Sequence, residues 1–285
     1  MSRNLFFIFL TIILMIIGCS QNNLTTNTFT SSVNGQEIYF REYGNNNNPE
    51  ILFIHGLMGS STSFTNVAKG ISTEFNVTLI DLPGHGNSGL EIDFSIDKLT
   101  ELVDEFINKK YTKPVTLVGY SLGGTIANAI SEKSNNKVNS YVLIDPWFSN
   151  NTSTDSLAFN FLSVIEKNAK NSWATNNDSI NYVKKMNPDL SEDQINIISN
   201  NRFDYDIKIW DSSVQKGTLI RNLNVPSKSP LLLIKPAASL IKESQIKKLS
   251  KNFLNLKVQA IPDTTHMIIF EEPESISNLI KDFIK

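Results

Sequence analysis

The sequence predicts an α/β fold built on a mostly parallel, doubly wound sheet. Short and nearly continuous apolar runs recur along the chain, as expected for strands that are buried on both faces of a parallel sheet. Stretches with helical spacing of apolar residues alternate with these runs, and this alternation is typical of a doubly wound sheet. A length of 285 residues with 40% apolar content suits one domain with room for an insertion.

The first expected element is an antiparallel pair of strands. Residues 28–33 and 37–42 have strand-like patterns, and they flank Asn34-Gly35, a dipeptide that strongly favours a tight hairpin turn. The folded domain is therefore expected to begin at Phe29 with a hairpin.

The parallel strands and their helices are expected to follow in alternation. A helix is expected after Ser95, a potential N-cap, because apolar residues at positions 99, 102, 103, 106 and 107 have helical spacing. Helical patterns also cover residues 122–132 and 245–249. The strands are expected at residues 51–54, 77–80, 115–118, 141–144, 231–234 and 257–261.

Residues 147–228 depart from this rhythm. They contain several helical patterns rich in aromatic residues and no convincing buried strand. A gap of this size between neighbouring strands is too long for a structureless loop. We expect an α-helical cap over residues 147–228, inserted after strand 6, and a core formed by residues 29–146 and 229–285.

The N-terminal segment has the pattern of an export signal. Arg3 precedes an apolar run over residues 5–17, which is too short for a comfortable transmembrane helix. The sequence IIGC at residues 16–19 resembles a bacterial lipobox. We expect residues 1–18 to be a lipoprotein signal peptide, residues 19–28 a tether, and Cys19 the lipidated residue that anchors the protein to a membrane of the bacterial cell envelope. The alternative is an uncleaved amphiphilic anchor.

Composition excludes some functions and cofactors. With 26 basic and 28 acidic residues and a net charge of −2, the chain lacks the basic footprint of a nucleic-acid-binding protein. Its single cysteine allows no intramolecular disulfide and no cysteine-based metal site. No metal or organic cofactor is expected, and the oligomeric state stays open.

The sequence GYSLG at residues 119–123 indicates a nucleophile. It lies between an expected strand and an expected helix. In this strand–turn–helix context a G-x-S-x-G motif indicates a nucleophilic serine. The tight turn forces the side chain of Ser121 out above the sheet, and the helix N-terminus presents free N–H groups to a developing negative charge. The alternative is an ordinary turn with a capping serine.

The sequence HGLMG at residues 55–59 follows the strand over residues 51–54, where an oxyanion loop belongs. A tetrahedral intermediate requires two convergent donors, and we expect them to be the backbone N–H groups of Leu57 and Leu122. Met58 and Trp147 are expected to line the substrate pocket, because a lid with aromatic side chains excludes water and binds apolar groups.

The general base is sought among three histidines. His55 and His85 lie in loops after expected strands, where structural hydrogen bonding is the favoured interpretation. His266 follows the last expected strand and precedes the last helix. It is therefore the expected base.

Together these motifs resemble the α/β-hydrolase superfamily, in its capped subgroup of esterases and related C–C and thioester hydrolases. The resemblance covers residues 29–285 except the cap, and it implies the chain order of nucleophile, acid and histidine. It rests on HG at residues 55–56, DLPGHGNS at 81–88, GYSLGG at 119–124, DTTH at 263–266 and EEP at 271–273.

The sequence departs from this family at the triad acid. The resemblance places the acid after the strand that follows the cap, where this chain has Ser239. Asp145, at the end of the preceding strand, is the best substitute, because adjacent parallel strands lie only about 5 Å apart. The alternatives are Asp263, Glu243 or no acid at all.

The expected function is hydrolysis of a small-molecule acyl substrate, most simply a carboxylic ester with an apolar part, through a Ser-His-Asp acyl-enzyme mechanism. A related alternative is cleavage of a thioester or a C–C bond. A different alternative is a non-catalytic envelope protein that binds a ligand or a partner on a hydrolase scaffold, and Ser239 is the feature that favours it.

Overall fold

The computed structural model describes residues 24–133, 136–148, 153–210, 229–253 and 255–285. These residues form one eight-stranded sheet in the order β1-β2-β4-β3-β5-β6-β7-β8. Strand β2 pairs antiparallel with β1 and β4, and the other pairs are parallel. The strands are β1 (Thr25–Thr30), β2 (Glu37–Tyr43), β3 (Glu50–Ile54), β4 (Asn76–Ile80), β5 (Val115–Tyr120), β6 (Val138–Ile144), β7 (Leu231–Pro236) and β8 (Leu256–Ile261).

The sheet confirms the expected α/β class, and every expected parallel strand overlaps an observed one. The first strand lies three residues earlier than expected, so residues 25–28 belong to the sheet and not to a tether. The reason is a longer turn, in which Ser31 N–H donates to Gln36 O at 2.9 Å and Asn34 and Gly35 take left-handed φ angles of 52° and 69°. Val33 is only 9% exposed within this turn, so its burial competes with extension of the strand.

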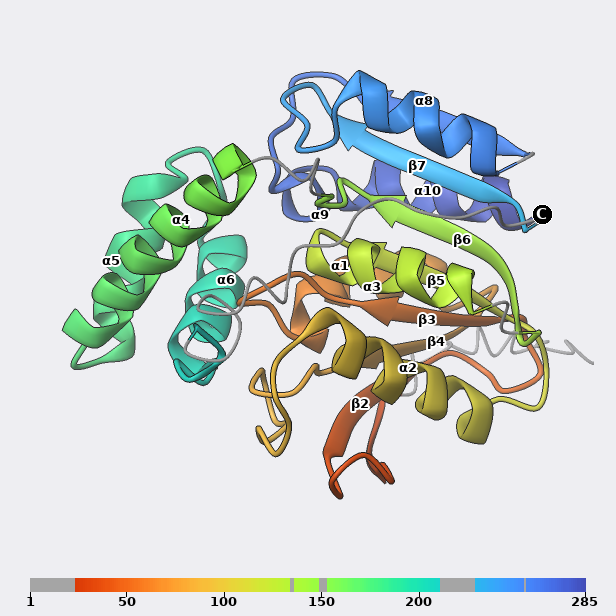
Figure 1. Cartoon of the computed structure of the whole chain (residues 1–285), viewed down its shortest axis with the longest axis horizontal. Helices are drawn as coiled ribbons and strands as arrows, with labels where there is room; N and C mark the ends of the chain where they lie inside the picture. Colours follow the sequence, from red (N-terminus) through yellow and green to blue (C-terminus); the bar gives the residue numbers. More distant parts are fainter. Residues whose placement is uncertain (1–23, 134–135, 149–152, 211–228, 254) are drawn as a thin grey trace, which may run out of the picture.

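Helices cover both faces of the sheet (Figure 1). Along β3, Leu52 and Ile54 belong to the core on one face, whereas Ile51 and Phe53 belong to the core on the other. This alternation explains the continuous apolar run, because both faces of the strand are buried. The first core includes residues of α2 (Ile96–Lys110), α3 (Leu122–Glu132) and α8 (Glu243–Asn252), and the second includes residues of α1 (Thr65–Ile71), α9 (Ile268–Glu271) and α10 (Pro273–Ile284).

Helix α2 shows how the sequence sets a helix boundary. The side chain of Ser95 accepts a hydrogen bond from Lys98 N–H at 3.3 Å, which satisfies a free donor of the first turn. Asp97 lies in the first turn, while Lys109 and Lys110 lie in the last turn, and both placements favour the helix dipole. The helix thus begins where the sequence predicts.

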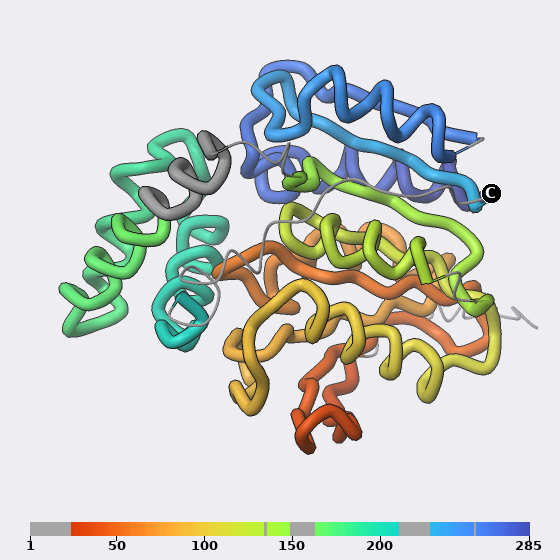
Figure 2. Tube along the Cα trace, in the orientation of Figure 1, coloured from red at the N-terminus to blue at the C-terminus, as the bar shows by residue number. Residues whose placement is uncertain are grey.

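In the described part of the segment between β6 and β7, where the cap is expected, the structure has three helices. They are α4 (Ser153–Ser172), α5 (Asn176–Met186) and α6 (Glu192–Asp204). Figure 2 shows them, in green to teal, as a group at one end of the sheet. Helix α6 contacts the short 3-10 helix η1 (Ser61–Phe64) of the core. The expected cap also includes residues 211–228, which lie outside the described residues.

The signal peptide, Cys19 and the first part of the tether also lie outside the described residues, which begin at Leu24. Within the described ranges, no helix is both long and apolar enough to span a membrane.

Candidate active site

Ser121 occupies a sharp turn between β5 and α3. Its φ and ψ are 52° and −115°, a conformation that side-chain-bearing residues rarely adopt. A Cβ atom on Gly119 would lie 2.2 Å from the Gly123 carbonyl oxygen, and one on Gly123 would lie 2.1 Å from the Ile54 carbonyl oxygen. Only glycine fits at either position, so the motif is required by the close passage of backbone around Ser121.

Ser121, His266 and Asp145 form one chain of hydrogen bonds. The Ser121 Oγ to His266 Nε2 distance is 3.1 Å, and the His266 Nδ1 to Asp145 Oδ2 distance is 2.7 Å. With its proton on Nδ1, the imidazole donates to the carboxylate and accepts from the serine hydroxyl. The three residues follow β5, β6 and β8, so the carboxyl ends of parallel strands bring them together.

Asp145 is held by groups from the neighbouring strand. Its side chain is completely buried, and its N–H donates to Ile234 O at 2.9 Å. Its Oδ1 accepts hydrogen bonds from the hydroxyl of Ser239 and from Leu240 N–H, the latter at 2.9 Å. Ser239, at the usual position of the acid, therefore contacts the carboxylate that faces His266.

The other two candidate carboxylates lie elsewhere. Asp263 is exposed, and the side chain of Glu243 is 84% exposed, with its nearest cationic partner, Lys235 Nζ, at 3.8 Å. The geometry thus favours Asp145 among the three.

Two side chains that the sequence analysis did not single out hold the His266 loop. The Tyr120 hydroxyl donates to the His266 carbonyl oxygen at 2.5 Å, and its ring stacks on the imidazole with centroids 5.0 Å apart. Glu271 accepts from Thr265 N–H at 2.8 Å. Both residues belong to motifs in the sequence, Tyr120 to GYSLG and Glu271 to EEP, but neither motif shows that its side chain contacts the His266 loop.

The loop after β3 passes directly over Ser121. A Cβ atom on Gly56 would lie 3.1 Å from the Ser121 Cβ. Leu57 follows Gly56 in this loop, and Leu122 is the first residue of α3, whose N–H has no acceptor within the helix. Both expected oxyanion donors therefore lie in segments adjacent to Ser121.

The remaining histidines hold this loop in place. His85 Nε2 accepts from Met58 N–H at 3.0 Å, and His55 Nε2 accepts from Leu82 N–H at 2.9 Å. Burial lowers the pKa of His55 to about 4 and that of His85 to about 3. Both rings are thus neutral acceptors near pH 7, in the structural roles that the sequence indicates.

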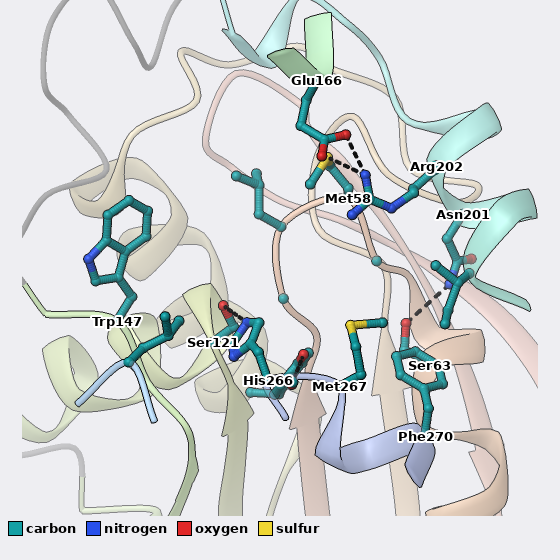
Figure 3. Close-up of a pocket in the computed structure, with 16 residues that line it drawn as sticks. Met58, Ser63, Ser121, Trp147, Glu166, Asn201, Arg202, His266, Met267 and Phe270 are labelled. Carbon is teal, nitrogen blue, oxygen red and sulfur yellow. Dashed lines mark hydrogen bonds and ion pairs between the residues drawn. The ribbon is translucent and has the colours of Figure 1, made fainter. Parts of the chain in front are cut away.

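A cavity of about 480 Å³ opens beside the three residues. Met58 and Trp147, the expected pocket residues, both line it. Figure 3 shows Trp147 on one side of Ser121 and His266, and Met58 with Arg202 and Glu166 on the other. The lining is mainly apolar and comprises Gly56, Leu57, Met58, Gly59, Ser63, Tyr120, Ser121, Trp147, Glu166, Ile198, Asn201, Arg202, Leu240, His266, Met267 and Phe270.

Glu166 and Arg202 of this lining come from α4 and α6, in the segment where the cap is expected. The sequence analysis missed them, because two charged residues on separate surface-like helices carry no local pattern that predicts a shared pocket.

The comparisons with known proteins concern the fold that carries this site. Residues 49–172, which include Ser121 and the oxyanion loop, match the model of the alpha/beta hydrolase fold family. The E-2-(acetamidomethylene)succinate hydrolase structure aligns over 92% of this chain and 99% of its own, with a TM-score of 0.75 and 20% identity. The chain has the α/β-hydrolase fold. A marine microorganism esterase aligns over 86% of this chain and 98% of its own, with a TM-score of 0.71 and 19% identity.

Two curated relatives show the range of sequence similarity to this α/β-hydrolase-fold chain. A pimeloyl-[acyl-carrier protein] methyl ester esterase of Wigglesworthia glossinidia brevipalpis is 26% identical over 245 residues, which cover 82% of this chain and 93% of the relative. A probable alcohol acetyltransferase of Wickerhamomyces anomalus is 38% identical over 104 residues, which cover 35% of this chain and only 30% of that protein. The long match is thus to an esterase.

Proposed function

We propose that the chain is a serine hydrolase that cleaves an acyl bond, most simply a carboxylic ester with an apolar part. The observation that carries the proposal is the hydrogen-bonded chain from Ser121 Oγ through His266 to Asp145 beside an apolar cavity. A serine hydroxyl is a weak nucleophile unless an adjacent base takes its proton. Here the imidazole Nε2 lies 3.1 Å from the hydroxyl oxygen, within reach for that transfer.

The mechanism uses this contact twice. Ser121 Oγ attacks the carbonyl carbon while His266 Nε2 takes the hydroxyl proton, and the N–H groups of Leu57 and Leu122 stabilise the resulting oxyanion. The intermediate then loses its alcohol, which receives the proton from His266, and an acyl-enzyme ester remains on Ser121. Water attacks this ester by the same route and releases the acid.

Asp145 has an electrostatic role in both steps. Its carboxylate fixes the imidazole tautomer and stabilises the imidazolium that each proton transfer creates. The hydrogen bonds from Ser239 and Leu240 satisfy Oδ1 of this buried carboxylate and hold it facing His266. Ser239 therefore supports an acid at Asp145, and it no longer favours the non-catalytic alternative.

The size and lining of the cavity support a substrate with an apolar part. A cavity of about 480 Å³ is within the range of small-molecule sites. The curated relative matched over 245 residues is named as a pimeloyl-[acyl-carrier protein] methyl ester esterase, which supports ester cleavage over thioester or C–C cleavage.

We also propose that Cys19 is lipidated and that the enzyme is anchored in the bacterial cell envelope. The topology is compatible with such an anchor. Thr25 pairs with Glu42, and Glu42 pairs with Thr78 in the middle of β4. Strands β1 and β4 are both antiparallel to β2, so β1 runs towards the carboxyl ends of the parallel strands, where Ser121 lies. A chain that enters β1 from the opposite direction is compatible with an anchor that leaves the cavity free.

The experiment that tests the hydrolase is turnover of p-nitrophenyl esters of increasing acyl length by a soluble form that begins at Asn22. The matched control is Ser121→Ala, and labelling by a serine-directed phosphonate is measured in parallel. We expect turnover and labelling that both require Ser121. Labelling of the Ser121→Ala protein, or the absence of both turnover and labelling in the wild type, would contradict the proposal.

A further inference from the structure

Helices α4 and α6 place a largely buried ion pair in the wall of the apolar cavity. Arg202 Nη1 on α6 donates to Glu166 Oε2 on α4. The side chains of Arg202 and Glu166 are 19% and 6% exposed, and both line the cavity beside Ser121. Tyr182 adds a hydrogen bond from its hydroxyl to Glu166 Oε1 at 3.3 Å. A charged pair in a mainly apolar cavity is costly to desolvate. We therefore ask whether this pair binds part of the substrate.

The backbone that carries Arg202 is held from two sides. The ammonium of Lys170 donates to the carbonyl oxygens of Arg202, at 3.3 Å, and of Phe203. Asn201 connects α6 to the core, because its amide nitrogen donates to Ser63 Oγ at 3.1 Å and its Oδ1 accepts from Ser60 Oγ at 2.7 Å. The guanidinium is thus presented from a fixed position, as a binding group requires.

The guanidinium keeps donors for a ligand. Arginine has five N–H donors, and the contacts of Arg202 with described polar atoms, Glu166 Oε2 and Met58 Sδ at 3.8 Å, both use Nη1. Among the described residues, Nε and Nη2 have no hydrogen-bond acceptor. These donors belong to a residue that lines the cavity (Figure 3), so a substrate oxygen can occupy them.

The charges around the cavity favour an uncharged substrate oxygen over a carboxylate as the acceptor for Arg202. Glu166 already balances the charge of Arg202, and among the described residues the groups that hold His266 and its loop include two further carboxylates, Asp145 and Glu271. A substrate carboxylate would therefore share one cation with the Glu166 carboxylate in a poorly solvated place, which is unfavourable. An uncharged acceptor gains the hydrogen bond without this repulsion.

We infer that Arg202, held by Glu166, binds an uncharged carbonyl or hydroxyl oxygen of the substrate on the side of Ser121 opposite Trp147. The inference rests on the proposed hydrolase function and narrows its substrate class. The substrate is an ester with an apolar group against Trp147 and an uncharged polar group towards Arg202. Trp147 and Arg202 then select two different ends of one molecule.

The test compares esters of equal length that end in a methyl, a hydroxyl, a primary amide or a carboxylate group. One series varies the acyl part of p-nitrophenyl esters, and a second varies the alcohol part of a fixed acyl ester, with acid release followed by a pH indicator. In one series we expect kcat/KM for the hydroxyl or amide ester to exceed that for the methyl ester about tenfold, because a hydrogen bond to a charged donor is lost in the methyl ester. The preference should disappear in Arg202→Met.

Glu166→Gln is the sharper variant, because it keeps the shape of the pair and removes its negative charge. It leaves the Arg202 cation unbalanced, so we expect the carboxylate ester to become the preferred substrate of the same series. Thermal unfolding of each variant checks that the cap is intact.

Three outcomes would overturn the inference. They are a wild-type preference for the carboxylate ester, equal use of methyl and polar esters in both series, and a polar preference that survives in Arg202→Met. With Ser121-dependent turnover present, each of these rejects the inference alone. Absence of Ser121-dependent turnover with every ester would reject it together with the proposed function.

Discussion

Ser239 donates its hydroxyl hydrogen to Oδ1 of Asp145, while Oδ2 of the same carboxylate lies 2.7 Å from His266 Nδ1. Two adjacent strand ends therefore share the acid position. Strand β6 supplies the carboxylate, and the loop after β7 supplies donors to it. The acid therefore comes from the end of β6, one strand away from the position that the resemblance implies. Ser239, which occupies that implied position, donates a hydrogen bond to the carboxylate of Asp145.

Replacement of Asp145 by asparagine should lower kcat by about three to four orders of magnitude, because an amide cannot fix the required tautomer or stabilise the imidazolium. KM should change little, since Asp145 is behind His266 and does not line the cavity. Steady-state kinetics on the preferred p-nitrophenyl ester measures both values. Wild-type kcat in this variant would transfer the role of the acid to another residue.

Ser239→Ala tests the support of the carboxylate. It removes one of two donors to Oδ1 and leaves Leu240 N–H in place, so we expect kcat to fall about tenfold, as for loss of one hydrogen bond to a charged group. Ser250→Ala on α8, whose hydroxyl donates only to Lys247 O within its own helix, is a matched control. Equal activity of Ser239→Ala and the control would show that the donor is dispensable.

Local patterns predicted most of the fold, because strands buried on both faces leave continuous apolar runs. The same logic located Ser121 and His266 at the ends of such runs. It was less accurate at the edge strand β1, where most side chains are exposed and no burial pattern fixes the register. Asp145 was the favoured acid, but the sequence left Asp263, Glu243 or no acid open, since the pairing of β6 with β7 is a non-local property.

The polar side of the cavity was beyond local patterns for a related reason. Glu166 and Arg202 are 36 residues apart and meet only when α4 and α6 pack together. Each residue alone is an ordinary charged position on a helix. Their ion pair and their place in the cavity wall are visible only in the tertiary structure.

The lipobox hypothesis predicts that Cys19→Ala blocks fatty-acid incorporation and signal-peptide cleavage in a bacterial host, because the thiol is the acylated group. Ser20→Ala is the matched control and should be processed normally. Incorporation of labelled palmitate and the size of the product on gels measure both steps. Normal processing of Cys19→Ala would refute the hypothesis, and an uncleaved, unlabelled wild-type protein in membranes would support the amphiphilic anchor.

The buried histidines predict a loss of stability in acid. The folded-state pKa values of His55 and His85, about 4 and about 3, lie below the ordinary value of 6.5. The unfolded chain therefore binds protons that the folded chain excludes, so the free energy of unfolding is highest above pH 6.5 and falls as the pH decreases towards the folded values. From pH 8 to pH 5 each ring should account for a loss of about 2 kcal/mol.

His85→Gln separates this contribution from other acid effects. The glutamine side-chain oxygen can accept from Met58 N–H in place of Nε2, and it does not titrate in this range. Urea unfolding at pH 8 and pH 5 should show a decrease in the variant that is smaller by about 2 kcal/mol than in the wild type. An equal decrease in both proteins would show that His85 does not resist protonation in the fold. Because Met58 lies in the loop over Ser121, the same acidification should open the oxyanion loop before the rest of the domain unfolds.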